Sequence, residues 1–488
     1  MKIILVPYCF HPDPIGGAEV YVEALAHELK ARGVTPVIVV PGLKNDEGEH
    51  HGLRVKRYAA NGGANDLQAL YGEGDEGAAE AFDHILEEER PQLVHLHAHT
   101  SAVSLRALRK AKQRGIPVIY TYHTATATCQ RGTMMRWGAE PCAGLMDLHA
   151  CAPCALHGLL QRRDGRRQPG EAAREVANPN FTGRGLHGLG KAESGGHHFL
   201  TSWLAAKCIG SLPPAFGGWL GRRGLQGGLW TALRMTELVQ LHHETMRAFL
   251  AEADHVVAVC DWVRQVLLRN GVADTQITLC RQGISIKAES GSQKSVVSSQ
   301  SSEVRPPSSV LRVCFLGRLD LNKGIHILVQ AIRSIPQAAL QLDIYGVAQG
   351  EAGRHYEQTL RHLANGDDRV KFCPPVPAAE IIATLKNYDL LAVPSQCLET
   401  GPLVVLEAFA AGVPVLGSRL GGIAELVRDG ENGMLVEAHS VAAWAAALER
   451  IGREPELASR LRAGIKPPHT MSLVADEMMG LYTRLMAR

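Results

Sequence analysis

The chain of 488 residues has few aromatic side chains, at 5%, and its formal net charge is only +2. Balanced charge gives no reason to expect a nucleic-acid partner. No apolar run approaches the roughly 20 residues that cross a bilayer. The apolar start, 1–7, lacks a charged leader, a full apolar region and a cleavage site, so it is expected to be a strand. These absences favour a cytoplasmic protein.

A disulfide framework is also missing, because the eleven cysteines are an odd number scattered along a long chain. Most, such as Cys314, are expected to be small buried hydrophobes. Four lie close together in one irregular stretch: Cys129, Cys142, Cys151 and Cys154. Two of these have the Cys-x2-Cys spacing of half a zinc site, although the first spacing is longer than in a usual zinc knuckle. We expect a structural zinc ion there, with a disulfide pair or ordinary packing as the alternatives.

Short apolar runs alternate with amphipathic helical patterns along most of the chain. Strands are expected at 2–7, 35–40, 93–96, 117–122 and 255–259, and again at 310–316, 339–345, 370–373, 390–393 and 413–416. Strands that alternate with helices at this spacing indicate parallel sheets with crossover helices. The fold class is therefore α/β, with two doubly wound, Rossmann-like domains facing across a cleft.

Composition sets the expected boundaries between these units. The first domain covers 1–285 and contains a large, glycine-rich and basic insertion at about 126–241. A Ser/Pro-rich linker at 286–309 leads to the second domain, 310–470. The last segment, 471–488, is expected to be a helix that packs back on the first domain.

The most informative stretch of the sequence runs from 394 to 433. A loop after a strand carries Glu399, and Glu407 follows eight positions later on the second turn of a helix. Pro402 is expected in the first helical turn, where proline is favoured. The helix N-terminus at Gly401, Pro402 and Leu403 presents free N–H groups, which suit a phosphate.

Two further motifs follow strands in the same way. Arg318 and Lys323 lie directly after a strand and before a helix, where they can neutralise a leaving diphosphate. Gly16 and Gly17 occupy the corresponding turn of the first domain, and their missing side chains allow the backbone to approach a ligand closely.

Together these motifs resemble the large family 4 type of retaining glycosyltransferases, typified by bacterial mannosyl- and glucosyltransferases and sucrose synthase, with the fold called GT-B. The markers are GGAE at Gly16, GRLDLNKG at Gly317, and the Glu399/Glu407 pair followed by GGIAE at Gly421. The resemblance covers nearly the whole chain except the insertion and the linker. Family members often have EGF- or EPFG-like residues after the first glutamate, whereas this chain has ETGP, so the identity of the sugar is not implied.

The resemblance also implies roles for individual residues. Arg318 and Lys323 would bind the donor diphosphate, and Glu407 would accept hydrogen bonds from the ribose hydroxyls. Glu399 would lie near the transferred sugar, with His123 beside it. Gly17 would let the first domain close against the phosphate and the acceptor.

The implied reaction moves a hexosyl group from a nucleotide-diphosphate sugar to a saccharide or lipid-linked acceptor, in polysaccharide or glycolipid biosynthesis. It retains the anomeric configuration by front-face displacement, in which the leaving phosphate helps to deprotonate the acceptor. No Asp-x-Asp motif for a divalent metal occurs, so no cofactor is expected for catalysis. The alternatives are a nucleotide-sugar epimerase of the same fold and a non-catalytic nucleotide-sugar-binding protein.

The segment 199–239 mixes large apolar and basic side chains: Trp203, Leu204, Phe216, Trp219, Leu220 and Trp230 with Lys207, Arg222 and Arg223. Such a mixture can rest on a membrane surface, which would place the protein at the inner face of the membrane. The alternative is a helical lid that packs on the first domain.

Overall fold

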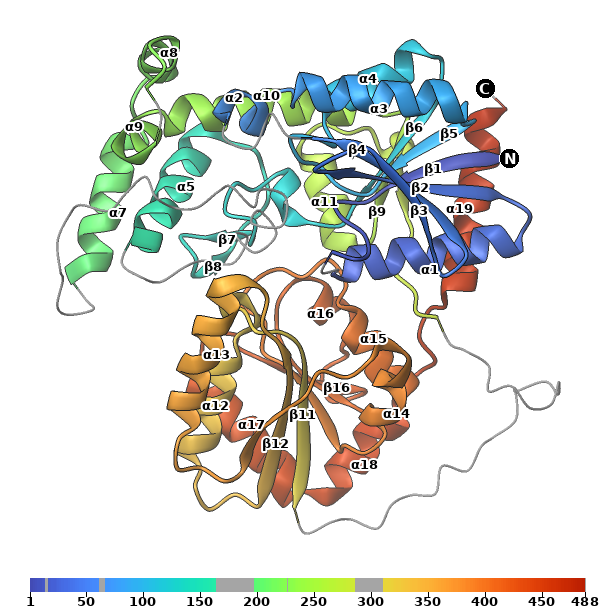
Figure 1. The fold of residues 1–488 in the computed structure, drawn as a ribbon. Helices are drawn as coiled ribbons and strands as arrows, with labels where there is room; N and C mark the ends of the chain where they lie inside the picture. Colours follow the sequence, from blue (N-terminus) through green and yellow to red (C-terminus); the bar gives the residue numbers. More distant parts are fainter. Residues whose placement is uncertain (14–15, 61–65, 164–196, 226, 286–309, 488) are drawn as a thin grey trace.

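The computed structural model describes residues 1–13, 16–60, 66–163, 197–225, 227–285 and 310–487. The expected linker at 286–309 and the residues 164–196 of the expected insertion lie outside this part of the chain. The described residues form two α/β halves, one above the other in Figure 1. None of their helices is both long enough and apolar enough to cross a membrane.

The first half is built on an eight-stranded sheet of order β10-β9-β6-β5-β1-β2-β4-β3. All neighbours in it are parallel except the pair β3–β4. Its strands are β1 (Lys2–Val6), β2 (Thr35–Gly42), β3 (Asp46–His50), β4 (Leu53–Ala59), β5 (Leu93–Leu96), β6 (Val118–Tyr122), β9 (His255–Ala258) and β10 (Ile277–Leu279).

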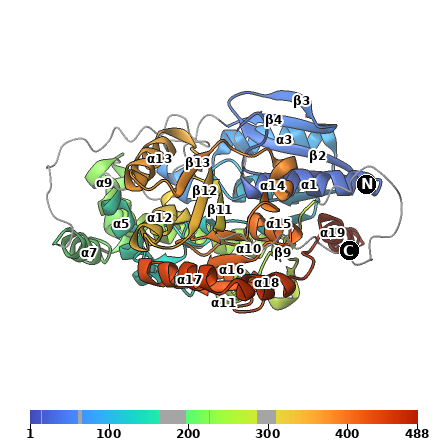
Figure 2. The ribbon, with the colours of Figure 1, turned by 90° about the horizontal axis from the view of Figure 1, so that it is seen from below.

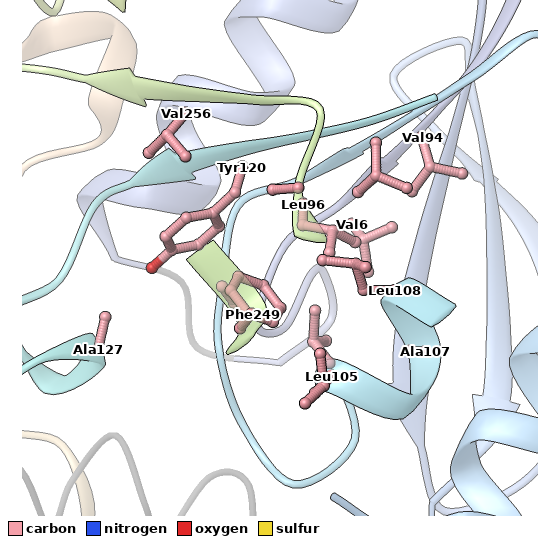
Figure 3. Close-up of a cluster of buried hydrophobic side chains, with 14 of the residues drawn as sticks. Val6, Val94, Leu96, Leu105, Ala107, Leu108, Tyr120, Ala127, Phe249 and Val256 are labelled. Atoms are coloured by element: carbon pink, nitrogen blue, oxygen red, sulfur yellow. The ribbon is translucent and has the colours of Figure 1, made fainter. Parts of the chain in front are cut away.

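Helices cover both faces of this sheet, so its central strands are buried on both sides. Along β1, Ile4 and Val6 enter one core and Ile3 and Leu5 the other. The first core lies under α3 (Glu76–Glu89), α4 (Leu105–Gln113), α10 (Met235–Glu252) and α11 (Asp261–Arg269), and part of it is shown in Figure 3. The second lies under α1 (Gly17–Ala31) and α19 (Met471–Met486). This two-sided burial explains why the strands are near-continuous apolar runs.

The second half has a six-stranded parallel sheet of order β13-β12-β11-β14-β15-β16. This is the strand order of the doubly wound dinucleotide-binding fold. The strands are β11 (Leu311–Arg318), β12 (Leu340–Val347), β13 (Val370–Cys373), β14 (Leu390–Val393), β15 (Val415–Ser418) and β16 (Gly433–Val436). The helices are α12 (Ile325–Ser334), α13 (Gly350–Ala364), α14 (Ile381–Leu385), α15 (Leu403–Ala410), α16 (Gly421–Leu426), α17 (Val441–Arg453) and α18 (Pro455–Ala463).

The last helix, α19, returns to the first half of the molecule. Its apolar face, which includes Val474, Met478 and Leu481, packs in the core under α1. Its Tyr482 hydroxyl group lies 2.8 Å from Nδ1 of the buried His95 on β5. The two halves are therefore linked by the chain twice, once at 286–309 and once before α19.

The described part of the expected insertion contains a short hairpin and several helices. The hairpin pairs β7 (Met135–Arg136) with β8 (Glu140–Pro141) and is followed by α5 (Leu148–Arg163). Beyond the gap come α7 (His197–Ile209), α8 (Pro214–Arg222) and α9 (Gly228–Leu233). Figures 1 and 2 place α7 and α9 at one end of the molecule, with the two chain termini at the other.

Candidate active site

The order of strands in the second sheet reverses between β11 and β14, which are neighbours. Loops that leave two such strands at their carboxyl ends run apart, and the crevice between them is the usual ligand site of this fold. The loop after β11 carries Arg318 and Lys323, and the loop after β14 carries Glu399. The topology therefore brings together the two motifs that the sequence separates by about 80 positions.

Lys323 and Glu399 form an ion pair in this crevice. The Lys323 Nζ lies 2.5 Å from Glu399 Oε1, and the Ser395 hydroxyl donates to the same oxygen at 2.8 Å. Burial alone would raise the pKa of Glu399, but the positive charge of Lys323 and these hydrogen bonds lower it overall. The positive charge of Arg318 also lowers the pKa of Glu399. Glu399 is thus an ionised carboxylate beside two cations.

Glycines allow the two loops to touch. Gly324 has a φ of +68°, and a Cβ atom at this position would lie 1.8 Å from the carbonyl oxygen of Pro394. Gly421 and Gly422 open α16 beneath the other side of the loop, where a Cβ on either would lie within 3 Å of the Glu399 carbonyl oxygen. The Gly422 N–H donates to that oxygen at 2.7 Å. The motif GGIAE therefore supports the backbone of Glu399.

The first half faces this crevice with the loop before α1. A Cβ added to Gly17 would lie 3.8 Å from the Leu403 side chain, so Gly17 faces the N-terminus of α15. Glu19, which sequence reasoning missed as a site residue, accepts a hydrogen bond from Gly16 N at 2.8 Å and is buried. Burial raises the pKa of Glu19, and the charge of Arg318 opposes that rise, which places these two side chains near each other.

His123 follows β6 and is buried at 6% exposure. Its Nε2 lies 3.0 Å from Nδ1 of His97, and its ring packs edge-on against Tyr21. Its own Nδ1 is buried without a hydrogen-bond partner. Burial lowers the pKa of His123 to about 3, so its imidazole is neutral at physiological pH. The backbone carbonyl of His123 accepts a hydrogen bond from the Thr400 hydroxyl, which joins it to the Glu399 loop.

Glu407 lies on the second turn of α15, as the sequence indicates, and is half-buried. Burial raises the pKa of its carboxyl group to about 7. The expectation for Pro402 was wrong by one position, because α15 begins at Leu403 and Pro402 is its N-cap residue. Its extended backbone, with ψ of 118°, keeps it outside the first turn.

The two halves are in direct contact around the crevice, a feature that the sequence did not indicate. The Trp262 indole N–H donates to the Glu399 carbonyl at 2.9 Å, and Leu398 N donates to Thr133 O at 3.1 Å. Glu425 of α16 caps α11 of the other half, accepting hydrogen bonds from Asp261 N and Trp262 N, each at 2.8 Å. The acceptors and donors lie far apart in sequence, so no local pattern reports them.

Neither the histidines on and after β5 nor the pair His11 and His50 has the geometry of a metal site. His95 and His97 have neighbouring rings, 4.0 Å apart, whereas His99 packs beside Phe249. Within the described residues, only His11, Glu23 and His50 form a set of three candidate ligand atoms within 4.8 Å of one another. The rings of His11 and His50 are stacked at 3.9 Å and nearly parallel, so their in-plane lone pairs cannot both point at one ion.

Two family models match separate parts of the chain: residues 15–143 match "Glycosyltransferase Family 4", and residues 299–466 match "Glycosyl transferases group 1". These matches confirm the resemblance to glycosyltransferases that the motifs of the sequence indicate. Each half of the chain therefore matches one of the two models.

Among curated relatives, D-inositol 3-phosphate glycosyltransferase of Corynebacterium glutamicum (strain R) is 34% identical over 36% of this chain and 44% of its own length. The protein of the same name from Nocardia farcinica (strain IFM 10152) is 32% identical over 41% of this chain and 46% of its own length. The chain therefore spans less than half of the length of these relatives.

Solved structures share the fold along the whole chain. Sucrose-phosphate synthase from Thermosynechococcus elongatus has a TM-score of 0.61 at 19% identity, covering 100% of this chain and 99% of that one. The Anabaena protein HepE, solved in complex with UDP-glucose, has a TM-score of 0.56 at 16% identity, covering 99% and 100%. These likenesses confirm the two-domain GT-B fold.

Proposed function

We propose that the protein is a retaining glycosyltransferase that moves a hexosyl group from a nucleotide-diphosphate sugar to a saccharide or lipid-linked acceptor. One observation carries the proposal: Arg318, Lys323 and Glu399 meet at the switch point of the second sheet, beside the α15 N-terminus and opposite Gly17. Two cations and a helix N-terminus provide the charge that a bound diphosphate needs. The relatives named above are glycosyltransferases, which favours transfer over epimerisation.

In this proposal the bond between the anomeric carbon and the leaving phosphate oxygen breaks as the acceptor oxygen approaches from the same face. The electron pair of that bond stays on the diphosphate, where Arg318 and Lys323 stabilise it. The acceptor proton passes to the leaving phosphate oxygen. Glu399, which already accepts from Lys323 and Ser395, orients Lys323 and the sugar. No divalent metal takes part.

Glu407 and His123 complete the proposed donor site. The Glu407 carboxylate would accept hydrogen bonds from the ribose hydroxyls. These hydrogen bonds would offset part of the free energy that it costs to bury the ionised carboxylate. The neutral His123 would offer its unpartnered Nδ1 to the transferred sugar.

A screen of UDP- and GDP-sugars tests the proposal, with EDTA present throughout. One donor should raise the melting temperature of the protein and release its nucleotide slowly. The Glu407→Ala variant should lose that stabilisation, whereas Glu437→Ala, a change at an exposed carboxylate, should keep it. Stabilisation without nucleotide release, even with acceptors added, would favour a non-catalytic binding protein, and no response to any donor would contradict the proposal.

We also propose that α7–α9 rest on an anionic membrane surface, which would bring the enzyme to lipid-linked acceptors. Five large apolar side chains are exposed here: Leu204, Phe216, Trp219, Leu229 and Trp230. The only charged side chains between 197 and 236 are basic. Exposed aromatic and basic side chains together suit the interface of an anionic bilayer.

Vesicle flotation tests this surface. The wild-type protein should float with vesicles that contain phosphatidylglycerol and not with pure phosphatidylcholine. The Phe216→Glu/Trp219→Glu variant should lose binding, whereas Leu473→Glu, at an exposed apolar position on α19, should retain it. Equal flotation of the wild type and the Phe216/Trp219 variant would contradict the assignment.

A further inference from the structure

The four cysteines of the insertion gather where its first elements meet. Cys129 follows a short 3-10 turn, and Cys142 follows the hairpin β7–β8, with its N–H donating to Met134 O at 2.8 Å. Cys151 and Cys154 lie one turn apart at the start of α5. All four side chains are partly buried, and none is in a disulfide bond.

Backbone N–H groups point at two of the sulfurs. Trp137 N donates to Cys154 Sγ at 3.3 Å, and Gly144 N donates to Cys142 Sγ at 3.5 Å. A neutral thiol is a weak acceptor, whereas a metal-bound thiolate is a strong one. The turn after Cys142, in which the N–H two residues later bonds to the sulfur, thus favours sulfur in its anionic form.

A buried cation lies beside the same group. Arg131 is 3% exposed, and its guanidinium donates to the Cys154 carbonyl oxygen at 3.1 Å. The same guanidinium is close enough to the sulfurs of Cys154 and Cys129 to interact with negative charge on them. The four cysteines are also near one another, because the Cys151 sulfur is close enough to those of Cys129, Cys142 and Cys154 to interact with them electrostatically.

We propose that Cys129, Cys142, Cys151 and Cys154 bind one structural zinc ion. Binding would release the four thiol protons to solvent and leave a tetrathiolate centre with a net charge of 2−, which Arg131 partly balances. Four thiolates without other donors suit zinc in a closed, tetrahedral site, and such a site has no position for substrate.

The sulfurs must move together to bind the ion. No three of them lie within 4.8 Å of one another, whereas bonds of about 2.3 Å in a tetrahedron require about 3.8 Å between sulfurs. Rotation about one cysteine side-chain torsion moves a sulfur by about 3 Å, so the proposal requires changes of rotamer on zinc binding. Zinc would then fix Cys129 and Cys142, the ends of the segment whose Thr133 carbonyl contacts Leu398 beside Glu399. The inferred role is therefore to hold one wall of the crevice in place.

Metal analysis of the full chain, purified without added zinc or chelator, tests this proposal. We expect about one zinc ion per chain, and cobalt exchange should give the sulfur-to-cobalt charge-transfer bands of a thiolate site. The Cys151→Ser/Cys154→Ser variant should lose the metal and melt more than about 5 °C lower. The Cys208→Ser/Cys373→Ser variant, whose changes lie outside the cluster, should keep the metal and the melting temperature of the wild type.

Three outcomes would overturn the proposal: folded wild-type protein without stoichiometric metal, a disulfide bond among the four cysteines found by mass spectrometry, or metal retained by the Cys151/Cys154 variant. The first two outcomes are measured on the wild-type protein, so they test the proposal even if the variant fails to fold. Metal content is measured without any donor, and its result is independent of the proposed transfer reaction.

Discussion

The Lys323 ammonium group holds Glu399 in its ionised form and, in the proposed reaction, also meets the donor diphosphate. Lys323→Ala removes a cation that stabilises the leaving group, so kcat/KM for transfer should fall at least about 100-fold. Steady-state nucleotide release measures this. Lys371→Ala, at an exposed lysine on β13, is the matched control and should change activity less than twofold. Activity of Lys323→Ala within a few fold of the wild type would exclude the assigned role.

Glu407 illustrates a conflict between stability and binding at a single carboxyl group. Burial raises its pKa from 4.5 to about 7, so between these values the unfolded chain loses a proton that the folded protein keeps. Stability contributed by the protonated group is complete below pH 4.5 and is lost as pH rises to about 7. Glu407→Gln should therefore stabilise the ligand-free protein by up to about 3 kcal/mol at pH 8 and not at pH 4.

The same variant should bind the donor about tenfold more weakly at pH 8, because an amide is a weaker acceptor than a carboxylate. Denaturant titrations at the two pH values and donor titrations at pH 8 separate these effects. Glu437→Gln, at an exposed position, should change neither quantity. A Glu407→Gln protein that is less stable at pH 8 would show that the carboxylate has a structural partner.

At the scale of elements, the alternation of apolar strands and amphipathic helices was enough to predict both sheets. β5, β13 and β14 have the predicted bounds. β5 and β14 are fully buried parallel strands, which are short apolar runs between turns. The hairpin of β3 and β4 was missed, since its first strand, DEGEH, is polar and exposed. Such an edge strand is held by backbone pairing with its neighbour, which leaves no apolar pattern in the sequence.

The candidate site was predictable only in part for a related reason. Motifs that end strands gave Arg318, Lys323, Glu399 and Gly17, because strand ends are recognisable locally. The Lys323–Glu399 ion pair and the contacts made by Glu425 cannot be recognised from local sequence, because each joins residues from different loops or different halves.

The loop between β11 and α12 depends on Gly324 for its approach to β14. Gly324→Ala places a methyl group against the Pro394 carbonyl in addition to the strain of a positive φ. We expect a loss of about 3 kcal/mol or more in the free energy of unfolding. Gly366→Ala has the same kind of backbone strain, with φ of +82°, but open space around it, and should lose only about 1 kcal/mol. Equal losses in denaturant titrations would mean that the loop moves aside without cost.

At the scale of the whole molecule, Glu425 connects the halves by capping α11 and by contacting Arg281 at 3.1 Å. Glu425→Ala should loosen this connection, because a lost helix cap costs about 1 kcal/mol and the Asp261 and Trp262 N–H groups lose their acceptor. X-ray scattering should show a larger radius of gyration for the ligand-free variant, and the amides of Asp261 and Trp262 should exchange faster with solvent. Glu431→Ala, which removes an ion pair within the second half, should leave both unchanged. Unchanged scattering and exchange in Glu425→Ala would exclude a connecting role.

In the proposed reaction a sugar is transferred with retention from a nucleotide-diphosphate donor held at the crevice after β11 and β14, which the first half faces. The most direct test is the anomeric configuration of the first product formed from an α-linked donor, followed by proton NMR in the presence of EDTA. The account predicts an α-linked product from the wild-type protein and none from Lys323→Ala. A β-linked product, or the same rate of product formation by Lys323→Ala, would contradict it.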